Sequence, residues 1–259
     1  MTIAKNILLK LHKEDIYDGY EPKFKLDLHG GGFPEIFSEL IADIQPLVIF
    51  EVGSWKGRSA IQMAKLLKQQ ERDSVLVCID TWLGGVEHLP PEIMESWSIH
   101  RYRKNGYPKL YYQFLSNIVR SGVSDIIVPF PNTSNISAAW LKKHKIQADL
   151  IYVDASHNYH DVFDDLTNYY DLLNENGIVF GDDYAGFDGV RRAVNEFVNQ
   201  RRLKLEVRQD QVWIIRKGFI SKRKIKKYFQ RNGLRLVTKD IIRKILNLLD
   251  LEIRRIPKV

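Results

Sequence analysis

The chain has 259 residues, of which 44% are apolar and 27% are charged. This length and composition suit one α/β domain with additional segments, and they exclude a disordered chain, a collagen and a disulfide-rich scaffold. No apolar stretch approaches the ~18 residues of a membrane span, and we expect no signal peptide because the first residues lack an apolar core. Cys78 is the single cysteine, so no intrachain disulfide can form and a reducing, cytoplasmic compartment is expected.

The positive charge is concentrated at the C-terminal end of the chain. Residues 216–259 carry 15 Lys+Arg and 3 Asp+Glu, a net charge of +12, whereas the rest of the chain has a net charge of −5. Such an asymmetry indicates an acidic partner, an anionic membrane surface or a plain solvated segment. Within this tail, residues 238–256 place most of their apolar side chains on one stripe of a helical wheel. That stripe would suit contact at the periphery of a membrane, or packing against the body or a second subunit.

Apolar, β-rich runs alternate along the chain with segments of helical periodicity. Helices are predicted at 34–44, 59–68, 109–121, 135–144, 158–173 and 188–201. Strands are predicted at 47–52, 75–80, 125–129, 149–154, 178–181, 204–208 and 212–216. The alternation predicts an α/β fold with a doubly wound, mostly parallel seven-stranded sheet, in which the last two strands form an antiparallel hairpin.

The same pattern divides the chain into three parts. Residues 1–33 are expected to form a lead or cap segment, 34–217 the α/β domain, and 218–259 a basic helical extension. Residues 81–110 are too many for a simple crossover, and we interpret them as an insertion over the strand ends, in the manner of a lid, or as an ordinary surface loop. Ligands of such sheets bind beyond the carboxyl ends of the strands, so the polar residues at those ends are the candidates for function.

The first candidate motif runs from Glu51 to Ser59 with the sequence EVGSWKGRS and joins the first strand to the following helix. Glycines at such a turn let the backbone approach a ligand, and the helix N-terminus offers free N–H groups to an anion. The motif is neither Gly-x-Gly-x-x-Gly nor a P-loop. Asp80, at the end of the second strand, can accept both hydroxyls of a ribose, although aspartate is also a favoured helix cap. The pair favours a nucleoside ligand.

A second set of polar residues follows the fourth and fifth strands. Asp154, Asp182 and Asp183 would repel one another at the sheet edge unless a cation lay among them or one stayed protonated. Oxygen ligands suit Mg²⁺ or Ca²⁺ better than zinc. His157 lies three residues beyond Asp154, and a histidine is suited to general-base work near neutral pH. The structural alternative is that the aspartates cap helices and that His157 is solvated.

Taken together, these residues resemble the class I S-adenosylmethionine-dependent methyltransferases over about residues 34–216, and most of all the metal-dependent catechol and macrolide-sugar O-methyltransferases. The resemblance implies a Rossmann-like fold, with S-adenosylmethionine and a divalent cation, expected to be Mg²⁺, as cofactors. It assigns His157 as the catalytic base and Asp154, Asp182 and Asp183 as metal ligands. The cofactor-binding residues that it implies are Glu51, Gly53, Ser54, Trp55, Gly57, Ser59, Asp80, Thr81, Trp82, Asn132, Thr133, Ser134 and Asp154.

The reaction implied by the resemblance is methyl transfer to a hydroxyl of a sugar, a glycoconjugate or another small molecule. One rival is a metal-dependent hydroxylase-like enzyme, because the family also includes proteins labelled hydroxylases. The other is a nucleic-acid-binding methyltransferase led by the basic tail, which the few aromatic residues of the tail disfavour. From Phe219 onward the chain departs from the family, so membrane contact and self-association remain alternatives for the tail.

Overall fold

The computed structural model describes residues 1–90 and 94–218 of the chain. Its centre is a seven-stranded sheet in the order β5-β2-β1-β6-β7-β9-β8. The five strands from β5 to β7 are parallel, and β9 runs antiparallel to both of its neighbours. The strands are β1 (Val48–Val52), β2 (Val75–Asp80), β5 (Ile127–Pro131), β6 (Ala148–Val153), β7 (Leu173–Gly181), β8 (Leu205–Arg208) and β9 (Val212–Arg216). The predicted fold class, including the closing hairpin, is confirmed. The amphipathic helix expected at 238–256 lies outside the described residues and stays a prediction.

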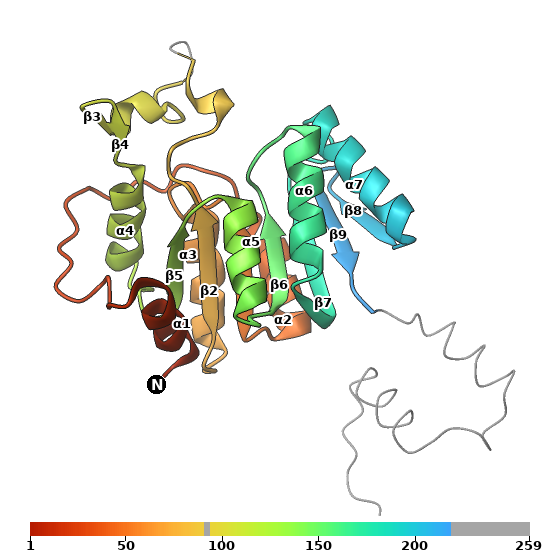
Figure 1. Ribbon diagram of the computed structural model, residues 1–259, viewed down its shortest axis with the longest axis horizontal. Coiled ribbons are helices and arrows are strands. Elements are labelled where there is room, and N and C mark those ends of the chain that lie inside the picture. The colour runs from red at the N-terminus through yellow and green to blue at the C-terminus, as the bar shows by residue number, and fades with distance from the viewer. Residues whose placement is uncertain (91–93, 219–259) are drawn as a thin grey trace, which may run out of the picture. The chain divides into compact units, whose positions relative to one another are not determined.

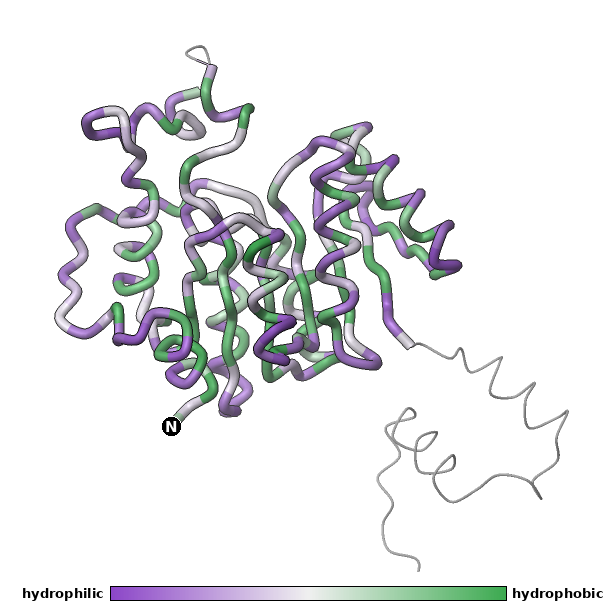
Figure 2. The backbone as a smooth tube through the Cα atoms, viewed as in Figure 1, coloured by the Kyte–Doolittle hydropathy of each residue, from purple (hydrophilic) through white to green (hydrophobic). Residues whose placement is uncertain are grey.

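Helices cover both faces of this sheet, as Figure 1 shows for α5 and α6 on the side toward the viewer. One apolar cluster packs α2 (Pro34–Ile44), α3 (Arg58–Gln69) and α4 (Leu110–Arg120) on one face. A second cluster packs α1 (Ile3–His12), α5 (Ser134–Lys143), α6 (Tyr159–Tyr170) and α7 (Asp188–Arg201) on the other. Successive residues of β2 alternate between the two clusters, Val77 in one and Cys78 in the other, because successive side chains of a strand point to opposite faces. The strands therefore lie in the hydrophobic middle of the molecule (Figure 2).

The helices and strands predicted between residues 34 and 216 are all present. The helix predicted at 158–173 ends already at Tyr170, because Leu173 pairs in β7, and two strands differ from the prediction in their bounds for physical reasons. The predicted strand at 125–129 lies instead at Ile127–Pro131 and contains Pro129 and Pro131. It pairs only with β2, and an edge strand tolerates proline because its free side needs no N–H donor. The strand predicted at 178–181 begins already at Leu173. Leu173 pairs with Ala148, and the register then shifts before Ile178 pairs with Leu150. Asn176, which lies between Leu173 and Ile178, has a φ of 68°.

Two segments outside the sheet acquire structure that the sequence did not predict. Residues 1–33 contain α1, whose N-terminus is capped by the Thr2 hydroxyl, which accepts a hydrogen bond from the Lys5 N–H. The insertion at 81–110 contains two short 3-10 helices, η1 (Val86–His88) and η2 (Ile99–Tyr102), and a two-stranded hairpin of β3 (Arg103–Lys104) and β4 (Tyr107–Pro108). Among the described helices, none combines the length and hydrophobicity that a membrane span requires.

Candidate active site

A cavity of about 700 Å³ lies at the carboxyl ends of the parallel strands. It spans the point at which the order of strands reverses, because β1 has β2 on one side and β6 on the other. Its volume is within the range of about 300–1,000 Å³ that is typical of small-molecule sites. Residues that follow β1, β2, β5, β6 and β7 line it, together with residues 29–31 and part of the insertion.

Gly53 follows β1 and occupies a place that no side chain could share. Its φ is 88°, and a Cβ atom there would lie 2.1 Å from the carbonyl oxygen of Asp154. The N–H of Gly53 donates to the carbonyl of Ile79 over 2.8 Å, so the loop also stays in contact with β2. The loop from Gly53 to Ser59, which the resemblance predicts to bind the cofactor and which we call the cofactor loop, is thus in direct backbone contact with the start of the segment after β6.

Asp80 supports the loop that follows Gly53. Its Oδ2 accepts hydrogen bonds from the backbone N–H groups of Ser54 over 3.0 Å and Trp55 over 2.8 Å. Its Oδ1 accepts one from the N–H of Trp82 over 2.7 Å. A carboxylate has about four lone-pair sites, so Asp80 keeps acceptor capacity for a ligand hydroxyl. It lines the cavity and holds the loop in shape, but it is the N-cap of no described helix, and its contact with a ribose stays a prediction.

Glu51 is completely buried beneath the same loop and does not line the cavity. Its two carboxylate oxygens accept hydrogen bonds of 2.6 Å from the hydroxyls of Ser54 and Ser59. Burial raises the pKa of Glu51 to about 7, against the opposing effect of the two hydroxyl donors. Gly57, with a φ of 84°, lets the loop pass Phe114, whose ring would lie 2.9 Å from an added Cβ. Both residues hold the loop in shape from outside the cavity.

The carboxylates after β6 and β7 form the other end of the cavity. Single ligand atoms of Asp154, His157 and Asp183 all lie within 4.8 Å of one another, a spacing that could hold a metal ion. Burial, together with the charges of Asp182 and Asp183, raises the pKa of Asp154 to about 7. Asp182 lines the same cavity but is not one of these three. A Cβ added at Gly31 would lie 3.4 Å from Asp154 Oδ2 and 3.8 Å from Asp182 Oδ2, so the segment 29–31 covers this cluster.

His157 lies between two carboxylates in the loop that joins β6 to α6. Its Nε2 is 2.9 Å from Asp183 Oδ2, and its Nδ1 is 3.6 Å from Glu87 Oε1 of the insertion. The imidazole ring stacks on Phe187 with the centroids 3.9 Å apart. Burial lowers the pKa of His157, but the two carboxylates outweigh this effect and raise it to about 10. The two carboxylates and the ring of Phe187 hold the imidazole in place.

Most of the residues expected in the site do line the cavity. They are Gly53, Ser54, Trp55, Ser59, Asp80, Thr81, Asn132, Thr133, Ser134, Asp154, His157, Asp182 and Asp183. Trp82 is placed differently, because it is buried in the core against Tyr111 and Phe114. Its indole N–H donates to the carbonyl of Trp55 over 2.8 Å, so it supports the cofactor loop from below and cannot pack on a ligand in the cavity.

Sequence reasoning missed the residues that line the cavity from outside the α/β core. His29 and Gly31 lie in the N-terminal segment, and Glu87, His88 and Trp97 lie in the insertion. His88 stacks on Trp55 with ring centroids 4.2 Å apart, and His29 meets Trp97 edge-on at 4.7 Å. Aromatic residues in a long insertion were the available signal, but nothing in the sequence indicated which of them face the cavity.

Comparisons with known proteins agree with this geometry. A family model described as a methyltransferase domain matches residues 50–184. The O-methyltransferase NovP has a similar structure, with 19% identity, a TM-score of 0.52, and coverage of 72% of this chain and 79% of that one. The calicheamicin methyltransferase CalS11 is 18% identical with a TM-score of 0.52 over 72% and 77% of the two chains. The cofactor-bound protein Rv0187 from MTB is 14% identical with a TM-score of 0.50 over 84% and 90%. These likenesses show a shared fold. Comparison of the sequence with curated proteins gives no match.

Proposed function

The chain belongs to the methyltransferase-domain family, whose model matches residues 50–184, and from this premise we propose that it is an S-adenosylmethionine-dependent O-methyltransferase assisted by a divalent metal ion. The observation that carries the proposal is the continuity of one cavity from the loop supported by Asp80 to the cluster of Asp154, His157 and Asp183. A nucleoside bound at the first end and a hydroxyl acceptor at the second would be held side by side in the same space.

The donor set at the second end fits a hard divalent cation. Two carboxylates and an imidazole lie within 4.8 Å of one another, and a third carboxylate, Asp182, is close enough to raise the pKa of Asp154. Carboxylate oxygens favour Mg²⁺, although the imidazole of His157 is more common around transition metals. A divalent cation bound by Asp154, Asp182 and Asp183 would lower the pKa of an acceptor hydroxyl and orient it, and would leave the imidazole of His157 free to take a proton.

The chain's own residues then have distinct parts in the transfer. The loop from Gly53 to Ser59 binds the methyl donor, and the rigid sheet edge aligns it with the acceptor oxygen, which supplies much of the rate enhancement. S-adenosylmethionine held there would supply a methyl group to the acceptor oxygen and leave as S-adenosylhomocysteine, and His157 in its neutral form would take the hydroxyl proton. Because Asp183 and Glu87 raise the pKa of His157, we expect it to act as a base only when the charge of Asp183 is engaged by another partner.

We propose a hydroxyl of a sugar, a glycoconjugate or another small molecule as the acceptor. The volume of the cavity and the aromatic rings of Trp55 and Trp97 at its wall support an acceptor of this size. Contact of the basic C-terminal segment with an anionic membrane, or with a second copy of the chain, is a further proposal, which vesicle sedimentation and oligomer size with and without residues 219–259 would test.

The direct test is incubation with methyl-labelled S-adenosylmethionine, Mg²⁺ and a panel of sugars, glycoconjugates and phenols. We expect label to appear in an ether and the transfer to stop in excess chelator. A protein that binds neither S-adenosylmethionine nor S-adenosylhomocysteine in calorimetry would contradict the proposal. Full turnover in excess chelator would leave the methyltransferase assignment intact but would contradict the proposed role of the metal ion.

A further inference from the structure

Lys56 lies in the middle of the cofactor loop, yet its charged end is used elsewhere. Its side chain is completely buried, and its Nζ donates to Asp27 Oδ2 over 3.0 Å and to the carbonyl of Ser96 over 2.8 Å. The ammonium also lies 5.1 Å from the centre of the Tyr102 ring. Asp27 belongs to the N-terminal segment, and Ser96 and Tyr102 belong to the insertion. One side chain of the cofactor loop therefore contacts both segments that lie outside the sheet.

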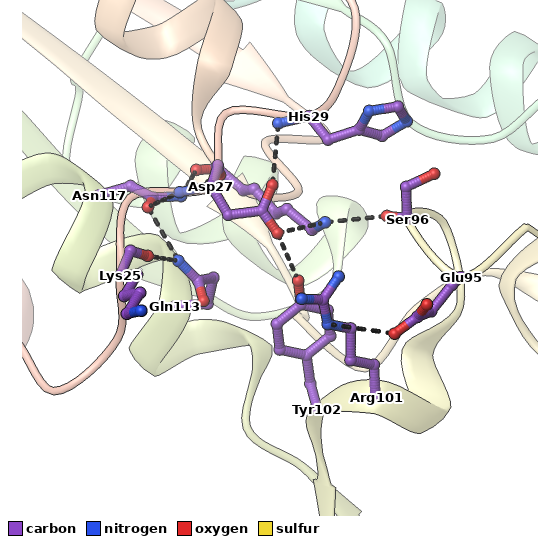
Figure 3. A network of polar contacts seen from close by, with 10 residues as sticks. Lys25, Asp27, His29, Glu95, Ser96, Arg101, Tyr102, Gln113 and Asn117 are labelled. Atoms are coloured by element: carbon purple, nitrogen blue, oxygen red, sulfur yellow. Dashed lines mark hydrogen bonds and ion pairs between the residues drawn. The ribbon is translucent and has the colours of Figure 1, made fainter.

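Asp27 is the centre of this network, as Figure 3 shows. Its Oδ2 accepts a second hydrogen bond from the Tyr102 hydroxyl over 2.8 Å, and its Oδ1 accepts one from the N–H of His29 over 3.2 Å. Burial raises the pKa of Asp27, but the bonds from Lys56 and Tyr102 outweigh it and hold the pKa below the usual value. Asp27 is therefore an anion that faces a buried cation, and each ion compensates the other.

Asn117 of α4 fixes the backbone on both sides of this ion pair. Its side-chain Nδ2 donates to the carbonyl of Asp27 over 2.7 Å and to the carbonyl of Lys56 over 2.8 Å. Its Oδ1 accepts the N–H of Asp27 over 3.0 Å and a hydrogen bond from Gln113 over 2.9 Å. The side chain of Asn117 is fully buried and makes all four of these hydrogen bonds, so it restricts the motion of the N-terminal segment at Asp27.

The segments held in this way carry the outer wall of the cavity. His29 comes two residues after Asp27, and Trp97 comes directly after Ser96; both line the cavity, and their rings meet at 4.7 Å. Gly31, four residues after Asp27, covers the carboxylates of Asp154 and Asp182. None of these wall residues belongs to the sheet, so their placement over the site depends on contacts such as the one between Lys56 and Asp27.

We propose that Lys56 and Asp27 are positioning residues that assemble the acceptor side of the cavity on the cofactor loop. The inference rests on the proposed function, because it takes the wall formed by His29, Gly31 and Trp97 to be the acceptor side. Neither residue touches the reacting atoms in this assignment. Lys56 acts through Asp27 and Ser96, and the wall residues that follow them contact the acceptor.

Hydrogen–deuterium exchange of the full chain tests this arrangement without an acceptor. Lys56→Met keeps the approximate length of the side chain and removes its charge. Lys68→Met makes the same change at a half-exposed residue of α3, whose Nζ pairs with Asp125 over 2.8 Å, and serves as the matched control. We expect Lys56→Met to speed exchange about tenfold in peptides covering 27–32 and 95–99, with little change in β2 and β6. Binding of S-adenosylhomocysteine should stay within about threefold of wild type in Asp27→Asn, because Asp27 lies outside the loop that binds the methyl donor. Lys68→Met should change neither.

Unchanged exchange in both peptides would overturn the proposal, and so would an equal rise throughout the sheet, which would reveal only a loss of stability. Should Lys56→Met fail to fold, Asp27→Asn tests the same pair from the other end, with the bond from Lys56 to Ser96 retained. With an acceptor from the labelled-methyl screen, both variants should raise its KM more than they lower kcat. A wild-type protein that does not bind S-adenosylhomocysteine would refute the proposed function, while exchange in the ligand-free protein would still decide the positioning role.

Discussion

His157 and Asp183 are 26 residues apart in the chain, but Nε2 of the imidazole lies 2.9 Å from Oδ2 of the carboxylate. The contact exists because one residue follows β6 and the other follows β7, which are adjacent parallel strands. Glu87 approaches the opposite side of the ring from the insertion. The orientation of the imidazole is therefore set by two carboxylates, Asp183 at the edge of the sheet and Glu87 in the insertion.

Replacement of His157 by Ala should lower turnover by about 10²–10⁴-fold, the usual contribution of a general acid or base. The affinity for S-adenosylmethionine should stay near that of the wild type, because the cofactor end of the cavity is built on other strands. His160→Ala, at an exposed position of α6 three residues further along the chain, is the control. Retention of most of the activity in the His157 variant at neutral pH would show that another group takes the proton.

Replacement of Asp154 by Asn should weaken Mg²⁺ or Mn²⁺ binding, because it removes one carboxylate charge from the cluster. Titration of the metal, followed by calorimetry or by Mn²⁺ paramagnetic resonance, measures this directly. Binding of S-adenosylhomocysteine should survive both the mutation and excess chelator. Asp210→Asn, at an exposed position between β8 and β9, should have no effect. Equal metal affinity in wild type and Asp154→Asn would remove Asp154 from the ligand set.

Replacement of Asp80 by Ala should weaken S-adenosylmethionine binding by about 10- to 100-fold, the equivalent of one or two charge-assisted hydrogen bonds. The carboxylate holds the backbone of Ser54, Trp55 and Trp82, so its loss disturbs the loop as well as the ribose contact. Asp125→Ala removes an exposed carboxylate and serves as the comparison. Calorimetry giving the same affinity for both variants would contradict the assignment of the cofactor end.

Glu51 should make the stability of the ligand-free protein depend on pH. Its pKa is about 7 in the folded protein and 4.5 as the ordinary value, because burial penalises the charged form. The folded state thus holds the proton more tightly, and stability falls as the pH rises from about 4.5 through 7. The loss approaches about 3 kcal/mol above pH 7. Glu51→Gln should lack this fall, so its stability relative to wild type should increase between pH 4.5 and 8 in urea denaturation. Parallel pH curves for the two proteins would show that the carboxyl is not buried as described.

Gly31 should tolerate alanine better than valine. The nearest atom to a Cβ at this position is Asp154 Oδ2 at 3.4 Å, an ordinary contact, whereas the branched methyls of valine would enter the space between Asp154 and Asp182. We expect Gly31→Val to weaken metal binding and Gly31→Ala to change it little, with S-adenosylhomocysteine binding retained by both. Metal titration of the two variants would detect the difference, and equal affinities would place residue 31 away from the bound ion.

The parts of the fold that could be predicted are those whose signal is local. β2 was predicted to the residue because Val75–Asp80 is an uninterrupted apolar run that ends in a carboxylate. β7 was predicted five residues short, because the sequence around Asn176 favours a turn while the pairing of Leu173 with Ala148 depends on another strand. The strand-end carboxylates could be predicted in the same way, since parallel strands bring their carboxyl ends to one edge.

The parts of the site that could not be predicted depend on contacts between distant segments. The approach of Glu87 to His157 spans 70 residues and passes through an insertion without periodicity. The family resemblance implied a cofactor contact for Trp82, but the residue has a left-handed backbone, with a φ of 53°, and its indole is buried in the core. The direction of a side chain after a strand depends on several backbone and side-chain dihedral angles, which the sequence pattern does not contain.

The backbone contact at Gly53 has a consequence for genetic suppression. Every atom that a Cβ at this position would meet within 2.6 Å belongs to the main chain of Asp154 and Ala155. A clash with a side chain can be relieved by a smaller residue at the second site, but a main-chain carbonyl is present whichever residue is there. When a substitution of Gly53 abolishes function, we therefore expect revertants to restore glycine at position 53. Substitutions at Asp154 or Ala155 should not suppress the defect.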